Sequence, residues 1–279
     1  MKRFSLVSSD VTDYCDGLVV RLLRRLCQLE ELRLRFNAGT TDNNWLIDGQ
    51  LLHNEVVAHL PHLKQFHFSL ISRLDELSVP VATPSKDDVQ RSFAENGLGP
   101  VEYDTRCHPV RNEVICHVYS LPYAFDVFKY LRNGYNRRDD FSRVTMLVMF
   151  GYASFEHGLF ANIAEDFPRL MSLEIQNMSR QKLKKHRGAI EPASLITFPR
   201  FERISLVGAG IDYLEQFLVD RITRLPRLHD LDVRFDDLLT ITDNFTNDAA
   251  RLNCSQVVRF MSEESVAPPA SFFAYFPRL

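Results

Sequence analysis

A short phrase recurs along the chain: a large apolar residue, proline, a basic residue and a second apolar residue. Copies begin at Phe167, Phe198, Leu225 and Phe276, and a variant with histidine in the basic position begins at Leu60. Proline biases the residue before it away from helical angles, and it cannot continue a helix because it lacks an N–H. Each phrase therefore predicts the end of a helix, and its recurrence predicts a repeat architecture.

The phrase also sets a register for the residues that follow it. With its first residue at offset 0, apolar residues recur at offsets 3, 6 and 8, and the later copies begin at 141, 167, 198, 225, 252 and 276. Offsets 6 and 8 point to one side of a strand, because side chains alternate along it. We expect adjacent parallel strands to align the offset-6 residues Leu147, Leu173, Ile204 and Leu231, followed by Val258 in a degraded copy that begins at Leu252.

The spacing of the copies predicts the fold class. Intervals of 24 to 31 residues overlap the period of roughly 20–29 residues that is typical of leucine-rich repeats. We predict an α/β, leucine-rich-repeat-like solenoid over residues 1–279, with a curved parallel sheet on the concave side and helices on the convex side. Helical spacing precedes two copies, over 156–167 and 212–225.

Residues 71–120 interrupt the pattern and predict an insertion that contains a short helix and a hairpin. A helix is expected to start near Ser85, and strands over 101–107 and 114–120 are expected to turn near Arg111. The second strand also fits a divergent repeat, with Cys116 and Val118 at offsets 6 and 8.

Composition limits the class of protein. A formal charge of −3 gives no bulk reason to expect nucleic acid as a partner. No segment approaches the roughly 18 apolar residues that a membrane helix needs. Five scattered cysteines favour a reducing compartment, so we predict a cytoplasmic protein. The basic cluster over 182–187 leaves a nuclear location open, although a solvated insertion explains it as well.

The residues between the core positions of each strand define the expected binding surface. At the centre, aromatic and apolar side chains are expected, and the flanks carry charge, which is the composition of an interface hot spot. An alternative is that the apolar residues pack beneath a loop such as 71–110. The predicted partner-binding residues are Arg33, Arg35, Tyr119, Val148, Phe150, Val207, Asp232, Arg234 and Arg259.

Other motifs predict no catalytic, cofactor-binding or metal-ligating residue. Gly208 and Gly210 resemble the opening of a dinucleotide-binding turn, but Tyr213 stands where its third glycine belongs. A turn near Arg111 places Cys107 across from Cys116, each followed by a histidine. Neighbouring residues on a strand point to opposite faces, so these four side chains do not converge on a zinc ion. We therefore expect a protein that is not an enzyme.

Longer phrases carry a resemblance to a family. The stretches 116–123, 154–168, 212–218 and 244–254 together resemble the C-terminal portion of F-box proteins with leucine-rich-repeat-like tails. The resemblance implies a substrate-recognition subunit of a cullin-type ubiquitin ligase, whose partner is another protein. These 279 residues contain no F-box, so adaptor binding is expected only if an F-box lies upstream. The alternative is a repeat scaffold for protein–protein interaction without a ubiquitin link.

Overall fold

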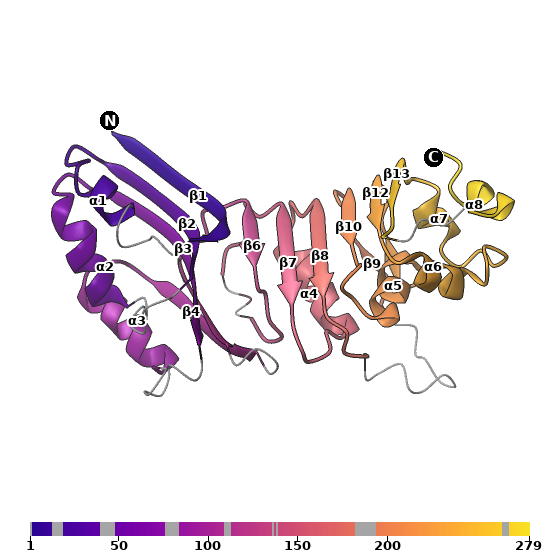
Figure 1. The fold of residues 1–279 in the computed structure, drawn as a ribbon, viewed down its shortest axis with the longest axis horizontal. Helices are drawn as coiled ribbons and strands as arrows, with labels where there is room; N and C mark the ends of the chain where they lie inside the picture. The colour runs from indigo at the N-terminus through magenta and orange to yellow at the C-terminus, as the bar shows by residue number, and fades with distance from the viewer. Residues whose placement is uncertain are drawn as a thin grey trace. The chain divides into compact units, whose positions relative to one another are not determined.

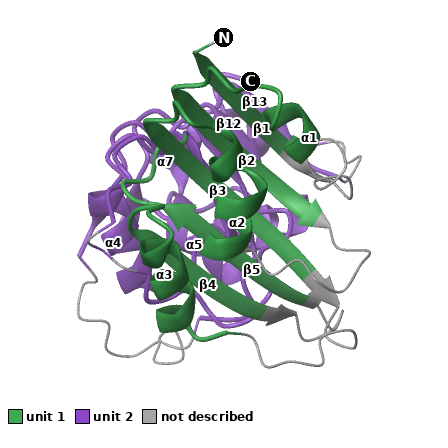
Figure 2. Cartoon of the chain, turned by 90° about the vertical axis from the view of Figure 1, so that its left-hand side faces the viewer, with its two compact units in different colours: residues 1–125 green, residues 126–279 purple. Residues whose placement is uncertain are grey.

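The chain divides into two compact units. A computed structural model describes residues 2–12, 19–39, 48–75, 84–108, 113–135, 137, 139–181, 194–263 and 268–279. Unit 1 comprises Met1–Phe125 and unit 2 comprises Asp126–Leu279 (Figure 1; Figure 2). Both units contain helices and strands, so the chain is a mixed α/β protein.

Unit 1 is built on a five-stranded mixed sheet, sheet A. Its order is β1 (Arg3–Thr12), β2 (Glu31–Gly39), β3 (Gln65–Asp75), β5 (Glu113–Ser120) and β4 (Val101–His108). The first three strands are parallel, whereas β5 is antiparallel to both β3 and β4. Only residues 109–112 join β4 to β5, and so short a connection permits only an antiparallel pair.

Helices cover one face of sheet A. They are α1 (Val20–Leu23), α2 (Gly49–Glu55), the 3-10 turn η2 (Val57–His59) and α3 (Lys86–Glu95). Figure 2 shows α1, α2 and α3 in front of the strands. The side chain of Asp48 caps α2 by accepting from the Leu51 N–H at 2.6 Å, and Ser85 caps α3 in the same way from Asp88.

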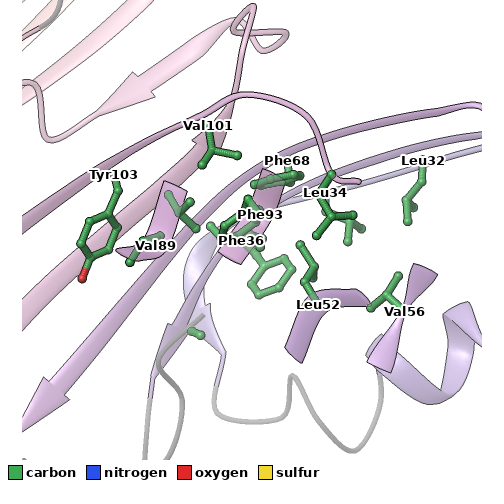
Figure 3. Packing of buried hydrophobic residues seen from close by; sticks show 14 of the residues in the cluster. Leu32, Leu34, Phe36, Leu52, Val56, Phe68, Val89, Phe93, Val101 and Tyr103 are labelled. Carbon is green, nitrogen blue, oxygen red and sulfur yellow. The ribbon is translucent and has the colours of Figure 1, made fainter. Parts of the chain in front are cut away.

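The core of unit 1 lies between this sheet face and the helices (Figure 3). Alternate residues of β2, such as Leu34 and Phe36, point into it, and the ring of Phe68 stacks on that of Phe93 from α3 at 5.4 Å. Gly49 begins α2 against the backbone of α3, where a Cβ atom would lie 2.5 Å from the Cα of Phe93. The close approach of α2 to α3 therefore requires glycine at position 49.

Unit 2 is built on a six-stranded sheet, sheet B, in which every strand is parallel to its neighbours (Figure 1). Its order is β6 (Val127–Lys129), β7 (Met146–Phe150), β8 (Ser172–Gln176), β10 (Arg203–Ser205), β12 (Asp230–Asp232) and β13 (Arg259–Met261). A small second sheet pairs β9 (Ile196–Thr197) with β11 (Thr223–Arg224). The helices are α4 (His157–Asp166), α5 (Ile211–Leu218), α6 (Phe235–Thr242), α7 (Arg251–Cys254) and α8 (Ala270–Tyr275).

The predicted alignment of the repeat in unit 2 is confirmed. Leu147, Leu173, Ile204 and Leu231 pair in sequence across β7, β8, β10 and β12, and each is at most 1% exposed. Phe128 of β6 extends this buried row at the end next to Leu147. The inner side chains of neighbouring strands therefore form one continuous core.

The prediction of a single leucine-rich-repeat-like solenoid over residues 1–279 is wrong. The strands form two separate main sheets, and sheet A is mixed instead of parallel. The segment 71–120, treated above as an insertion, contains α3 and the β4–β5 pair, and β5 takes a place inside sheet A. Cys116 and Val118 therefore lie on an antiparallel strand and do not form a parallel repeat. The phrase specifies a turn and a following strand, but it does not specify which strand becomes the neighbour.

Two boundaries also differ from the predictions. Phe260 pairs with Leu231, so the last copy aligns from Cys254, and Val258 is 51% exposed instead of buried. The helix expected over 212–225 ends at Leu218, because Val219 adopts extended angles and the chain then enters β11. The phrase at Leu225 therefore follows a short strand.

Candidate recognition surface

The strands of sheet B have one buried side and one partly exposed side. In β7 the burial alternates, so that Leu147 and Met149 are buried while Val148 and Phe150 are partly exposed. In β10, Ser205 is likewise partly exposed, next to the buried Ile204. We call the partly exposed side the sheet B face; its row through Val148 comprises Lys129, Val148, Glu174, Ser205, Asp232 and Met261.

Aromatic side chains gather at the β7 end of the sheet B face. The Phe150 ring meets Tyr152 edge-on at 5.1 Å and Tyr130 at 6.3 Å between centroids. Tyr152 is 41% exposed. Amphipathic rings of this kind supply contact area at interfaces, because their apolar faces and polar tips suit a surface that is wet before binding.

Charged side chains gather at the β12–β13 end. Asp230 accepts from Arg203 at 2.8 Å and from Arg259 at 2.5 Å. Burial alone would raise the pKa of Asp230, but hydrogen bonds from the two guanidinium groups outweigh it and hold this pKa below its usual value. Beside this cluster, the Ser205 hydroxyl donates to Asp232 at 2.9 Å. This end therefore presents a fixed arrangement of charges and hydrogen-bonding groups.

The predicted partner-binding residues fall into two groups. On the sheet B face lie Val148 and Phe150 of β7, Asp232 of β12 and Arg259 of β13, in the order of their strands. Val207 and Arg234 are close by in sequence, just beyond the ends of β10 and β12, and both are partly exposed. The Arg234 guanidinium lies 3.8 Å from Asp237 in the first turn of α6. Unit 2 therefore collects six of the nine residues.

The other three residues belong to sheet A, so the nine predicted residues do not lie on one sheet as expected. Arg33 and Arg35 are on β2 and Tyr119 is on β5. Tyr119 is 4% exposed, and its ring contacts those of His117 and Tyr123, so it is a buried residue. Arg33 donates to the Ala124 carbonyl and lies over the Phe125 ring, 5.6 Å from its centroid.

Sheet A holds a buried polar cluster that the sequence patterns did not reveal. The Ser69 hydroxyl lies 2.9 Å from Nε2 of His117, and the Tyr123 hydroxyl donates to Ser69 at 3.3 Å. Ser69 and His117 are at most 3% exposed. Alternation along β3 and β5 points both side chains away from the helix-covered core, and the antiparallel pairing of β3 with β5 makes them neighbours.

Burial determines the chemical state of that cluster. Burial and, to a smaller extent, the nearby charge of Arg106 together lower the pKa of His117 from 6.5 to about 3. The imidazole is therefore neutral at physiological pH and accepts or donates hydrogen bonds without charge. A hydroxyl beside an imidazole is the pair needed for nucleophilic catalysis, but here both groups are enclosed, and they join β3 to β5.

The remaining motifs have structural places. The Gly210 N–H donates to the Asn177 carbonyl at 2.9 Å, and the Asn177 N–H donates to the Gly208 carbonyl at 2.9 Å, so both glycines belong to the turn that starts α5. Thr105, and not Cys107, pairs with Cys116 in the β4–β5 hairpin. The basic cluster over 182–187 lies outside the described residues.

In the described part of the chain, no three His, Cys, Asp or Glu side chains are grouped so that they could hold a metal ion. None of the described helices has the length and apolar character needed to cross a bilayer. Comparisons with protein-family models, curated proteins and solved structures found no match.

Proposed function

We propose that this chain is a non-enzymatic protein-recognition module that binds its partner on the sheet B face. The observation that carries the proposal is the arrangement of one sheet face, with partly exposed aromatic rings at the β7 end and ordered charges at the β12–β13 end. Aromatic and arginine side chains are the residues most enriched at protein interfaces. The partly exposed Phe150 and the Arg259 guanidinium are the expected contacts at the two ends.

The resemblance to F-box proteins supports a narrower proposal, in which the partner is a substrate of a ubiquitin ligase. That link requires an F-box upstream of residue 1 in the same protein, since these 279 residues contain none. A general scaffold for protein–protein interaction uses the same face without that link. Co-purification of a cullin adaptor with the full-length gene product separates the two.

A site-specific crosslink tests where the partner binds. A photoreactive benzoylphenylalanine replaces Val148 on the sheet B face or, as the matched control, Phe273 on α8, which is 55% exposed. We expect a discrete crosslinked partner from position 148 and none of the same mass from position 273. The crosslink from position 148 should weaken in Phe150→Ala and in Arg234→Ala, while Phe273→Ala leaves it unchanged.

These variants are suited to the test because they leave the fold intact. Phe150 and Arg234 are partly exposed, and the Arg234–Asp237 pair is a surface ion pair, which contributes about 0–1 kcal/mol to stability. Melting curves followed by circular dichroism check this point. If both variants keep the wild-type crosslink yield, the sheet B face is not the binding surface and the proposal fails.

A further inference from the structure

The basic residue of the repeated phrase occupies the same position of the same turn in four successive copies. In each turn the N–H at offset 3 donates to the carbonyl at offset 0, with distances from 3.0 to 3.4 Å. Proline is favoured at the second position of such a turn, which leaves the third for the basic residue. The four residues at that position are Arg143, Arg169, Arg200 and Arg227, with serine in place of proline before Arg143.

Hydrogen bonds between the turns hold these arginines in register. The Thr145 carbonyl accepts from the N–H groups of Met171 and Ser172 at 2.8 and 2.9 Å, and the same pair of bonds recurs at the next two turns. Each arginine precedes an aligned core residue by four positions, from Leu147 to Leu231. Because adjacent strands are about 4.8 Å apart, the four Cα positions form a row about 14 Å long.

The first three arginines line one hollow on the surface of unit 2. Its volume is about 550 Å³, and its lining residues are Ser142, Arg143, Pro168, Arg169 and Arg200. No carboxylate is among these residues, and all five are exposed. Within the described chain, no close ion pair joins any of the three guanidinium groups to an acidic side chain. Arg143 does lie near Asp140: after the hydrogen bonds from Ser142, its charge contributes to the lowered pKa of that carboxyl.

This concentration of positive charge runs against the composition of the whole chain. The turn segments 141–145, 167–171, 198–202 and 225–229 contain four arginines and one acidic residue, Glu202, in a protein whose formal charge is −3. Asp140 immediately precedes the first segment and bonds to Ser142. Like charges on neighbouring turns repel each other, so a row of arginines favours an anion bound between them. An anion that enters the hollow relieves this repulsion and accepts several charge-assisted hydrogen bonds.

We propose that the hollow is a binding site for a phosphorylated segment of a protein partner, with the phosphate held by Arg143, Arg169 and Arg200. The planar guanidinium fork matches a phosphate and binds it through paired hydrogen bonds, and clustered arginines recognise phosphopeptides for that reason. Ser142 also lines the hollow, but its side chain and its N–H both bond to the carboxylate of Asp140, so the three arginines are the donors to the phosphate. Single-stranded nucleic acid fits less well, because no aromatic side chain for base stacking lines the hollow and the chain is acidic overall.

The experiment is a fluorescence anisotropy titration of the full chain with labelled peptides. One peptide sequence is used in three forms, with two phosphoserines, with two glutamates or with two serines at the same places. Inorganic phosphate and a single-stranded oligodeoxynucleotide of matched charge serve as two further probes. We expect the phosphopeptide to bind at least about tenfold more tightly than the serine peptide, since hydrogen bonds to charged groups are each worth about that factor.

Paired variants assign the binding to the hollow. Arg169→Gln with Arg200→Gln should weaken the phosphopeptide by about tenfold for each arginine removed. The control pair, Arg221→Gln with Arg278→Gln, removes the same charge from exposed positions of unit 2 that do not line the hollow, and should leave affinity within about twofold. Arg169→Lys with Arg200→Lys keeps the charge but loses the fork, so an intermediate affinity is expected. Melting curves check that each variant folds.

Specific outcomes overturn the proposal. If the phosphorylated and serine peptides bind equally tightly, the hollow is not a phosphate site. If both glutamine pairs lose the same affinity for the phosphopeptide, the binding depends only on net charge. If the oligonucleotide binds as tightly as the phosphopeptide, the ligand is a nucleic acid and not a phosphorylated peptide. If inorganic phosphate binds as tightly as the phosphopeptide, the site recognises phosphate alone and the peptide contributes nothing. Because the hollow does not include the sheet B face, Phe150→Ala should leave phosphopeptide binding unchanged, so the two proposals fail independently.

Discussion

Asn253 is the buried polar residue whose removal should most damage unit 2. Its side chain is enclosed, with the residue 2% exposed, and its amide nitrogen donates to the carbonyls of Thr223 at 2.8 Å and Leu218 at 3.1 Å. Its amide oxygen accepts from the Leu225 N–H at 2.9 Å. One side chain thus satisfies backbone groups where α5 ends and the next repeated phrase begins.

Truncation to alanine leaves three buried backbone groups without these partners. The residues concerned, Leu218, Thr223 and Leu225, are each 0% exposed, so water does not replace the lost bonds without opening the structure. An unsatisfied buried polar group costs about 1–3 kcal/mol. We expect Asn253→Ala to lower the free energy of unfolding of unit 2 by about 3–5 kcal/mol, because some relaxation offsets the upper limit. For a unit of roughly 150 residues, this corresponds to a fall in Tm of about 10 °C.

The matched control is Asn247→Ala. Asn247 also donates to one backbone carbonyl and accepts from one backbone N–H, at 3.1 and 3.0 Å, but it is only partly buried, so water can take over both bonds. Its loss should cost about 1 kcal/mol. Circular dichroism melts of both variants, with hydrogen exchange to confirm that the change lies in unit 2, give the comparison. If Asn253→Ala is no more destabilising than Asn247→Ala, the argument from buried backbone groups is refuted.

Asn253→Asp tests the same geometry with charge. The second carboxylate oxygen would face carbonyl oxygens in a buried site, so the ionised form should be disfavoured and the carboxyl pKa raised above its usual value. A raised folded-state pKa means that stability is complete below the unfolded-state value and is lost as the pH rises through the folded-state value. The variant should therefore gain stability relative to wild type between pH 7 and pH 5, and a constant difference across this range would contradict the assignment.

Three further predictions concern burial and close packing. Burial and the charge of Arg106 lower the pKa of His117 from 6.5 to about 3, so between these two pH values the unfolded chain binds a proton that the folded chain does not. The free energy of unfolding of unit 1 should therefore fall by up to about 1.4 kcal/mol per pH unit as the pH falls below 6.5, and His117→Asn should flatten this slope in urea titrations. Val257 is 0% and Val258 51% exposed, so Val257→Ala should lower the free energy of unfolding by about 2 kcal/mol and Val258→Ala by less than about 0.5 kcal/mol. Equal losses would favour the repeat copy that begins at Leu252, in which Val258 is a core residue. Gly49→Ala should destabilise unit 1 by about 1–3 kcal/mol, because its methyl group meets the α3 backbone, and an unchanged Tm would show that α2 can move away freely.

The candidate surface was predictable only in part. Alternation along β7 was enough to predict that Val148 and Phe150 point away from the core, and the structure places both on a partly exposed face. Tyr119 has the same alternation but is buried, and the ring of Tyr123, from the segment that follows β5, packs edge-on against it. Alternation assigns a side chain to a face of a strand, but it does not determine what covers that face.

The sequence alone determined the repeated turns and the core row of unit 2. The turn chemistry is local, and the constant spacing from turn to strand aligns Leu147, Leu173, Ile204 and Leu231 once their strands are adjacent. It also determined the recurring arginines, although only the stacked turns show that three of them share one hollow.

Only the tertiary structure decided which strands are neighbours and in which direction they run. The division into two units, the antiparallel place of β5 in sheet A, and the meeting of Ser69 with His117 all depend on pairings between distant segments. Such pairings are chosen by the burial and backbone hydrogen bonding of the whole sheet. A turn phrase of four residues carries no information about them, because the same turn can lead into a strand beside any partner that completes the core.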